Sequence, residues 1–372
     1  MKIAFISTFY PFRGGIAQFN ANLYEELKKK HEVVSFTFTR QYPNFLFPGK
    51  TQYVTPEDKA IPIDSIPILD SINPFSYFKT AKRIAKEKPD IVITRYWISY
   101  LAPSLGMVAK LLRRRGFKVI AILDNVIPHE SKFFDKPCAK WFLKHTDGCI
   151  SMSKSVEKDM LSLRKDVRHT LSPHPLYNHF GEKIDPILAK SKLGINSSKR
   201  TLLFFGLIRD YKGLDLLIDA MNYLDNDYQL LIAGESYGSF EKYDQQINSI
   251  QKPDRVKIFN RYIEDEEVPI FFSSSDVCIL PYKSATQSGI TAIAYHLDVP
   301  LIATRTGGLS EAIEEPGTGL MVPEISSQSI AETIMKFFTI DRKFFIDNIQ
   351  KQKELLTWEN FSNDLINLVK SL

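Results

Sequence analysis

The sequence predicts an α/β protein with two doubly wound domains, each built on a parallel sheet that helices cover on both faces. Short apolar runs alternate with helical patterns along the whole chain, which is typical of parallel sheets. A Pro- and His-rich segment, 172–183, interrupts this alternation near the middle. The length of 372 residues also fits about two domains of ordinary size. We therefore expect one domain over 1–175 and a second over 180–355.

The first half contains five runs that are predicted to be strands, because they are short, apolar and bounded by turn residues. They cover residues 3–7, 33–38, 90–95, 118–123 and 149–151. Helices are expected between them, near 17–30, 74–87, 101–115 and 153–163. Asn73 followed by Pro74 suits an N-cap and a first helical turn, and so marks the start of one helix.

The second half repeats the pattern with six further strand candidates. They cover residues 201–206, 228–234, 256–260, 277–280, 300–303 and 320–322. A last helix is expected at about 357–371, where five apolar residues fall on one stripe: Trp358, Phe361, Leu365, Ile366 and Val369.

The charge is unevenly distributed. The net charge is +5, but residues 1–180 hold 28 Lys and Arg against 16 Asp and Glu, while 181–372 hold 20 against 27. Basic clusters lie at 82–88 and 110–118. They are either solvated helix faces or a surface that docks on anionic lipid headgroups, and no nucleic-acid partner is expected.

Cysteine usage and hydropathy indicate a cytoplasmic protein. The three cysteines are far apart and in no metal-binding spacing, so we expect reduced thiols. The first residues are predicted to form a strand and not a signal peptide, and no apolar run is long enough to span a membrane. Peripheral attachment to the inner face of the cell membrane stays open.

The segment 281–323 predicts a phosphate site. A polar loop, 284–288, follows an apolar strand, and Gly289 opens a helix. Gly307 and Gly308 stand before another helix, after the next strand. Helices that start at the carboxyl ends of adjacent strands direct free N–H groups and positive dipole ends into one place. A phosphate group suits that position.

A second glycine pair, Gly14 and Gly15, follows the first strand and leads into a helix. This loop also suits an anion, although the pair is equally explained by a tight strand-to-helix turn. It is not the G-x-G-x-x-G fingerprint, because the glycines are adjacent and no third one follows, so a dehydrogenase is not expected.

Two further loops at predicted strand ends carry polar side chains. In G-L-I-R-D-Y-K-G, 206–213, Arg209 and Lys212 offer a planar fork and a point charge, a pair that suits a diphosphate; a solvated pair is the plainer alternative. The loop 123–130 is either a site or a capped surface turn, and it gathers Asp124, Asn125, His129 and Glu130.

No metal site is expected from the sequence. The triplet Asp225-Asn226-Asp227 precedes a strand and follows a helix, where an ordinary turn is the better interpretation. The histidines in and near the 172–183 segment are separated by prolines and form no ligand pair on a helix.

These loops, in this order, resemble the retaining glycosyltransferases of family four, which have the GT-B fold, and the resemblance covers the whole chain. It rests on the Gly14-Gly15 loop, the G-x-x-R-x-x-K-G loop, the two later glycine loops, G-T-G-L-M-V-P and the final W-E-N-F helix. The resemblance implies two Rossmann-like domains that face each other across a cleft. The N-terminal domain, 1–175, would meet the acceptor, and the C-terminal domain, 180–355, would bind the nucleotide-sugar. The last helix, 356–372, would cross back onto the first domain.

The resemblance also implies roles for individual residues. Arg209 and Lys212 would hold the diphosphate and stabilise it as it leaves, so no metal or other cofactor would be needed; the co-substrate would be a UDP- or GDP-type sugar. Asp124 and His129 would act near the reacting sugar, and Asn125 and Glu130 near the acceptor. The other donor contacts would come from Gly14, Gly15, Arg261, Tyr262, Thr286, Gln287, Ser288, Gly289 and Ile290.

One departure from the family pattern concerns two glutamates. The family usually carries one before the helix glycine, which holds sugar hydroxyls, and one inside the helix, which holds the ribose. Here Thr286 and Gln287 occupy the first place, and the second falls on Ile293 or Ala294. Thr286 or Gln287 would then replace the sugar-binding glutamate.

The predicted function is retaining transfer of a sugar from a nucleotide-diphosphate sugar to a glycan or lipid-linked acceptor, in surface polysaccharide or glycoconjugate biosynthesis. The alternative is a non-catalytic GT-B subunit that binds nucleotide or glycan as a scaffold. The missing glutamates motivate the alternative, whereas the complete set of phosphate-binding residues favours the enzyme.

Overall fold

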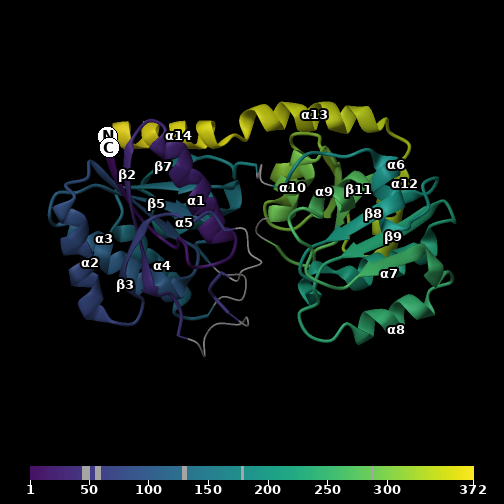
Figure 1. Cartoon of the computed structure of the whole chain (residues 1–372), viewed down its shortest axis with the longest axis horizontal. Coiled ribbons are helices and arrows are strands. Elements are labelled where there is room, and N and C mark those ends of the chain that lie inside the picture. Colours follow the sequence, from purple (N-terminus) through teal and green to yellow (C-terminus); the bar gives the residue numbers. More distant parts are fainter. Residues whose placement is uncertain (44–50, 55–59, 128–131, 177–179, 286–287) are drawn as a thin grey trace. The chain divides into compact units, whose positions relative to one another are not determined.

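The computed structural model describes residues 1–43, 51–54, 60–127, 132–176, 180–285 and 288–372. The chain divides into two compact units (Figure 1). Unit 1 contains Met1–His174 together with Trp358–Leu372, and unit 2 contains Pro175–Thr357. Each unit is described by itself.

Unit 1 is built on a seven-stranded parallel sheet in the order β3-β2-β1-β4-β5-β6-β7. The strands are β1 (Lys2–Ile6), β2 (Glu32–Arg40), β3 (Ser65–Asp70), β4 (Ile91–Tyr96), β5 (Val119–Leu123), β6 (Gly148–Ser151) and β7 (Arg168–Leu171). The helices are α1 (Gly15–Lys28), α2 (Pro74–Lys86), α3 (Ala102–Arg113), α4 (Asp135–Lys144), α5 (Lys154–Leu163) and α14 (Trp358–Ser371), with a short 3₁₀ turn η2 (Ser99–Leu101).

Unit 2 is built on a six-stranded parallel sheet in the order β10-β9-β8-β11-β12-β13. Its strands are β8 (Arg200–Phe205), β9 (Tyr228–Ala233), β10 (Val256–Phe259), β11 (Val277–Leu280), β12 (Leu301–Thr304) and β13 (Gly319–Val322). Its α-helices are α6 (Pro186–Leu193), α7 (Leu214–Ala220), α8 (Glu241–Ser249), α9 (Val268–Ser273), α10 (Gly289–His296), α11 (Leu309–Ile313), α12 (Ser327–Phe337) and α13 (Arg342–Leu355). Its 3₁₀ turns are η3 (Asp210–Lys212), η4 (Met221–Tyr223) and η5 (Pro253–Arg255).

The predicted fold class is confirmed, because both sheets are parallel and doubly wound. In each sheet the strand order reverses once, between β1 and β4 in unit 1 and between β8 and β11 in unit 2. Open sheets of this kind bind ligands outside the carboxyl ends of the strands at that reversal. The loops after β1, β4, β8 and β11 are therefore the ones to examine.

Two strands, β3 and β7, were not predicted. Both lie at the edges of the unit 1 sheet. β3 contains Pro67, which an edge strand tolerates because one side of the strand needs no hydrogen bonds. β7 has the sequence Arg-His-Thr-Leu and is partly exposed along its length, so it lacks an apolar run. Neither matches the pattern of a buried central strand.

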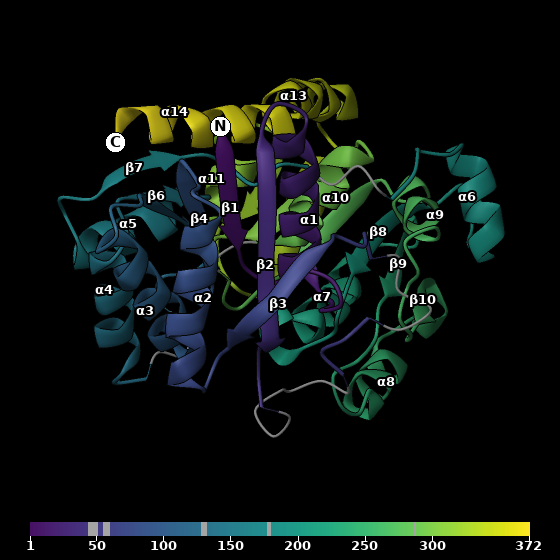
Figure 2. The same ribbon diagram turned by 60° about the vertical axis from the view of Figure 1, so that its left-hand side comes forward.

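Each unit has apolar clusters on both faces of its sheet. One face of the unit 1 sheet is completed by α14, which lies beside α1 (Figure 2). Trp358 and Phe361 of α14 place their rings 4.9 and 5.4 Å from that of Phe19 in α1. Segments at opposite ends of the sequence thus share one core.

Local signals explain several helix boundaries. Asn73 caps α2 as predicted, since its Oδ1 accepts from the N–H of Phe75 at 3.1 Å. Ser153 and Ser326 cap α5 and α12 in the same way. In the described part of the chain, no helix has the length and apolar character needed to cross a lipid bilayer.

Candidate functional site

The clearest candidate site lies at the strand reversal of unit 2. Lys212, in the loop after β8, and Ile290, at the start of α10, meet at Gly206. A Cβ placed on Gly206 would lie 3.4 Å from Lys212 Nζ and 3.2 Å from Ile290 Cδ1. The structure therefore brings together two of the predicted phosphate-binding elements, the Arg209/Lys212 loop and the head of α10.

Lys212 is a buried cation, with 9% of its surface exposed. Within the described residues its ammonium group has no ion-pair partner, and it lies 5.6 Å from the centroid of the Tyr282 ring. Burial, and secondly the positive charge of Arg209, lowers the pKa of Lys212 to about 8. A buried charge without a partner is unfavourable, so this site favours the arrival of an anion.

Arg209 belongs to the same loop as Lys212 and likewise has no ion-pair partner among the described residues. Its guanidinium carbon lies 4.7 Å from the centroid of the Tyr237 ring. Its Nε is buried and has no hydrogen-bond partner in the part of the chain that the structure describes. Stacking on an aromatic ring holds the planar group while leaving N–H donors free, which is the arrangement that recognises phosphate oxygens.

The start of α10 adds neutral donors. Ser288 is the N-cap, and its Oγ accepts from the N–H of Ile290 at 3.3 Å and lies 3.1 Å from the hydroxyl of Tyr282. Around Gly289, a Cβ would meet no atom within 4 Å. The Ser288 cap engages the N–H of Ile290, and among the described residues the space around Gly289 at this helix start is open.

Two glycines hold the loop in place. Gly213 has φ +67°, and a Cβ there would lie 2.0 Å from the carbonyl oxygen of Pro281, which follows β11. Gly234, after β9, has φ +148°, and its Cβ would lie 2.1 Å from the carbonyl oxygen of Gly206. The backbones after β8, β9 and β11 therefore pack together at distances that only glycine permits.

The structure describes only some of the other residues that were predicted to contact the donor. Arg261 follows β10 and forms a bidentate pair with Glu267, with both N–O distances 2.6 Å; Tyr262 beside it is half exposed. Thr286 and Gln287 lie outside the described residues. Ile293 and Ala294 are buried in the unit 2 core and present no polar group where the family has its ribose glutamate.

The second predicted glycine-loop helix is present but short. α11 spans only Leu309–Ile313, after Gly307 at φ +52°. A helix of five residues has a small dipole, because few peptide units are aligned in it. Most of the anion attraction in unit 2 therefore comes from Arg209, Lys212 and α10.

In unit 1, Gly14 and Gly15 stand at the head of α1. Gly14 has φ +104°, which favours glycine, so the tight-turn interpretation is sufficient to explain it. Gly15 is the first residue of α1, and a Cβ on it would meet nothing within 4 Å. The space beside this helix start is open as well, as an anion contact would need.

Asp124 is paired with an arginine, which the sequence analysis did not predict. Arg95, at the end of β4, is 1% exposed and binds both carboxylate oxygens of Asp124, with Nε 2.6 Å from Oδ2. Its guanidinium carbon also lies 3.8 Å from the centroid of the Phe19 ring, and Nη1 donates to Asn20 Oδ1 at 3.2 Å. Asp124 is thus a fixed, paired carboxylate.

Sequence reasoning missed Arg95. A signal was present, because Arg95 is the one charged residue in the run 91–96, and a charged residue in a buried strand is seldom without a partner. Asn125 follows Asp124 and is partly buried. His129 and Glu130, the other members of this predicted group, lie outside the described residues.

The predicted turn at Asp225–Asp227 is found, since the N–H of Asp227 donates to Asp225 Oδ1 at 2.9 Å just before β9. Over the described ranges, no group of three or more His, Cys, Asp or Glu side chains is placed to hold a metal ion.

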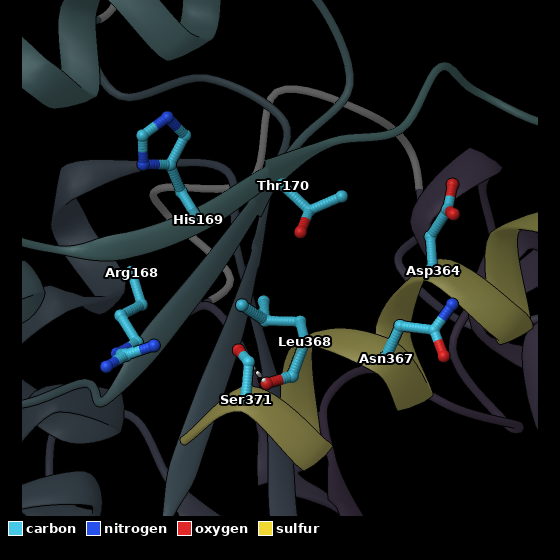
Figure 3. A pocket seen from close by; sticks show the side chains of 7 residues that line it. All are labelled: Arg168, His169, Thr170, Asp364, Asn367, Leu368 and Ser371. Atoms are coloured by element: carbon cyan, nitrogen blue, oxygen red, sulfur yellow. Dashed lines mark hydrogen bonds between the residues drawn. The ribbon is translucent and has the colours of Figure 1, made fainter.

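A separate hollow of about 330 Å³ lies in unit 1 between β7 and α14 (Figure 3). Its polar groups are largely engaged with each other or with neighbours. Asp364 accepts from Ser172 Oγ at 2.7 Å, His169 Nε2 lies 3.2 Å from Glu157, and Ser371 donates to the Leu368 carbonyl at 2.8 Å. This hollow therefore leaves fewer polar groups for a ligand than the unit 2 site does.

Comparison with known proteins points in one direction for both units. Residues 187–352 match the family model described as glycosyl transferases group 1, and residues 13–172 match the model described as glycosyltransferase family 4. Each match falls within one unit. Together they cover most of the chain.

Individual proteins agree with the family models. The chain is 23% identical to the uncharacterized glycosyltransferase MJ1178 of Methanocaldococcus jannaschii, over 96% of this chain and 95% of that protein. It is 26% identical to a GDP-mannose:glycolipid 4-beta-D-mannosyltransferase of Xanthomonas campestris, over 61% of this chain and 65% of that protein. Among solved structures, Anabaena HepE in complex with UDP superposes with a TM-score of 0.72 over 100% of both chains, at 14% identity.

Proposed function

Because this chain is a GT-B glycosyltransferase of the group 1 and family 4 type, we propose that it transfers a sugar from a nucleotide-diphosphate sugar to a glycan or lipid-linked acceptor, with retention of configuration. The observation that supports the donor assignment most is that Arg209 and Lys212, beside the start of α10, have no ion-pair partner among the described residues. Two free cations and a helix start match the charge of one diphosphate.

In this proposal the diphosphate is both the anchor and the leaving group. As the bond between the anomeric carbon and the diphosphate oxygen breaks, negative charge grows on that oxygen. Arg209 and Lys212 offset it, which lowers the energy of the transition state more than that of the bound donor. The acceptor hydroxyl attacks the anomeric carbon on the face that the diphosphate leaves, and its proton passes to the departing diphosphate.

The remaining roles are assigned on the resemblance and on position. Gly14 and Gly15 contribute N–H groups from unit 1. Asp124, held by Arg95, accepts a hydrogen bond from a sugar hydroxyl. A carboxylate whose two oxygens are fixed by a guanidinium suits orientation of a hydroxyl better than proton transfer, because protonation would break the pair.

The donor is of the UDP or GDP type. HepE was solved with UDP, and the Xanthomonas relative is named for GDP-mannose. We propose that the base contacts Arg261 and Tyr262, and that Ser288, Gly289 and Ile290 contact the phosphates. We also propose that no metal is required, since two cations already offset the diphosphate charge; transfer should then persist in a chelator.

The proposal is tested by removing each cation separately. Arg209→Ala and Lys212→Ala should each cost about 2–4 kcal/mol of transition-state stabilisation, which is roughly 30- to 1000-fold in turnover. Donor hydrolysis by mass spectrometry across UDP- and GDP-sugars supplies the rate. Lys242→Ala is the matched control, because Lys242 lies nearby but is already paired with Asp210. Wild-type turnover in either site variant would refute the assignment of this loop.

The same experiment addresses the scaffold alternative. Calorimetry against a panel of nucleotide diphosphates gives binding, and the hydrolysis assay gives chemistry. Binding without hydrolysis or transfer over a broad acceptor panel would support a non-catalytic subunit. The comparisons do not favour that outcome.

We also propose peripheral attachment to anionic membranes through the basic clusters 82–88 and 110–118 of unit 1. In the 82–88 cluster, Arg83 is paired with Glu87, while Lys82 and Lys86 are exposed. Attraction of this kind is screened by salt. Flotation with anionic liposomes should therefore show binding that weakens from low to high salt, and binding that is absent or insensitive to salt would remove the proposal.

A further inference from the structure

A second hollow in unit 1 lies at the amino ends of β5 and β6, whereas Asp124 follows the carboxyl end of β5. It has a volume of about 610 Å³ and is formed where α3 leads into β5 and α4 leads into β6. The charged side chains that line it are Lys110, Arg113, Arg114, Lys118, Lys144 and Asp147. A volume of this size is typical of small-molecule sites.

The charges in this hollow do not cancel. Its single carboxylate, Asp147, is already engaged, since it accepts from Arg113 Nε at 3.0 Å and from the Val119 N–H at 2.8 Å. Throughout the described ranges, the side chains of Lys110, Arg114, Lys118 and Lys144 form no ion pair. Four cationic groups are therefore left without a partner.

Helix dipoles account for only part of this positive charge. Basic residues often stabilise the negative end of a helix, and α3 and α4 both end at the hollow. Lys110 lies in the last turn of α3, and Lys144 lies in the last turn of α4. Arg113 Nη1 also donates to the Lys144 carbonyl at 2.9 Å, and Arg164 Nη1 donates to the Leu143 carbonyl. Arg114 and Lys118 lie outside both helices, so their charges are additional to those at the helix ends.

His145 also lines the hollow. Its ring is partly buried in the hollow, where Nδ1 lies 2.8 Å from the Trp141 carbonyl oxygen. Burial, together with the positive charges of Lys110, Arg113 and Lys144, lowers the pKa of His145. The groups that face His145 across the hollow are thus mainly cationic, with Asp147 as the exception.

We propose that this hollow binds a phosphate-bearing anion at a site separate from the donor site. Arginine forks and lysine ammonium groups are the side chains that recognise phosphate. β5 separates the hollow from Asp124, and its five residues span about 17 Å at the usual strand rise. The proposal uses none of the residues assigned to glycosyl transfer, so each can fail without the other.

The ligand's phosphate can come from a soluble compound or from a lipid headgroup. Pyrophosphate is the probe for the first source, and vesicles of phosphatidylglycerol, compared with phosphatidylcholine, are the probe for the second. Amide hydrogen exchange of the full chain, followed by mass spectrometry, locates the contact. We expect slower exchange in peptides that cover 110–118 and 143–147.

Charge reversal provides the matched variants. Arg114→Glu with Lys144→Glu removes two exposed cations of the hollow, and Lys136→Glu with Lys158→Glu makes the same charge change at two exposed lysines outside it. Calorimetry is done in an Arg209→Ala/Lys212→Ala background, so that pyrophosphate does not also bind the donor site. The hollow variant should weaken pyrophosphate binding at least tenfold, and the control less than twofold.

Each outcome either supports or overturns the proposed phosphate site. Protection by pyrophosphate that the hollow variant loses supports a soluble phosphate ligand. Protection only by phosphatidylglycerol vesicles, lost in the same variant, supports a lipid headgroup. Absence of protection with both probes overturns the proposal. Equal losses in the hollow and control variants also overturn it, because they would show a general charge effect.

Discussion

At the scale of single residues, the most consequential observation is that Lys212 titrates near physiological pH. Its pKa is about 8, lowered mainly by burial. A bound diphosphate favours the ammonium form and so raises this pKa. Nucleotide binding should therefore take up protons at pH 8, and the Kd for UDP or GDP should rise above pH 8, by up to about tenfold per pH unit.

Calorimetry in buffers of different ionisation enthalpy measures the proton uptake directly, and a pH series from 7 to 10 gives the Kd. Lys212→Met should abolish the pH dependence as well as weaken binding. Without nucleotide the sign for stability is opposite. The unfolded chain binds more protons between the folded pKa of about 8 and the ordinary lysine pKa of 10.5, so the contribution of this group to stability rises with pH there. A Kd that stays constant from pH 7 to 10 would contradict this account.

The Arg95–Asp124 pair belongs to the same scale. Asp124→Ala would leave Arg95, which is 1% exposed, as an unpaired buried charge. We expect a loss of about 3–5 kcal/mol in the free energy of unfolding of unit 1, measured by urea titration. Arg95→Met combined with Asp124→Leu should lose less, because no charge is stranded. A loss below about 1 kcal/mol in Asp124→Ala would show that the pair is not as buried as described.

This pair also shows which part of the site could be predicted. Arg209 and Lys212 stand out in the sequence because a glycine-bounded loop after an apolar strand carries two cations of the same sign. Arg95 and Asp124 are 29 positions apart, and only the parallel pairing of β4 with β5 places them side by side. Contacts that depend on strand register cannot be predicted from the sequence of a single loop.

At the scale of elements, the loop from β8 to α7 depends on Gly213. Gly213→Ala adds a Cβ at 2.0 Å from the Pro281 carbonyl oxygen, at a residue with φ +67°. Gly194→Ala is the matched control, because Gly194 has φ +61° but open space around it. The control should cost roughly 1–2 kcal/mol from backbone strain alone.

Gly213→Ala should cost clearly more than the control in urea unfolding. It should also weaken UDP or GDP binding at least tenfold, since Lys212 precedes it directly and moves with the loop. If both variants lose the same stability and keep wild-type nucleotide affinity, the close approach to Pro281 does not position this loop.

The element predictions succeeded where burial dictates the sequence and failed where it does not. Central strands such as β8 and β9 are buried on both faces, so they appear as continuous apolar runs. The edge strands β3 and β7 have less to bury, and they tolerate Pro67 and the polar run 168–170. The helix predicted after Gly308 is present as the short α11, which ends where the chain turns at residues 314–317.

At the scale of the whole molecule, the two units differ in net charge and in tryptophan content. Unit 1 holds 29 Lys and Arg against 18 Asp and Glu, whereas unit 2 holds 19 against 25. The three tryptophans, Trp97, Trp141 and Trp358, all belong to unit 1. Tryptophan fluorescence therefore reports on unit 1, and far-ultraviolet circular dichroism reports on both units.

This difference allows the donor site to be assigned to a unit by thermodynamics. A nucleotide at 100 times its Kd stabilises the unit that binds it by about 2.7 kcal/mol. We expect UDP or GDP to raise the midpoint of the circular-dichroism transition of unit 2 and to leave the fluorescence midpoint nearly unchanged. A shift confined to fluorescence would place the nucleotide on unit 1 and contradict the proposed donor site.

The placement of α14 has a consequence for how the protein is made. Residues 358–371 are synthesised after all of unit 2, yet Trp358, Phe361 and Leu365 fill the core of unit 1 beside Phe19. Domains generally fold during synthesis in the order in which they emerge from the ribosome. Here the first domain to emerge must wait for the second to be completed before its own core can close, with the apolar face beside α1 uncovered in the meantime.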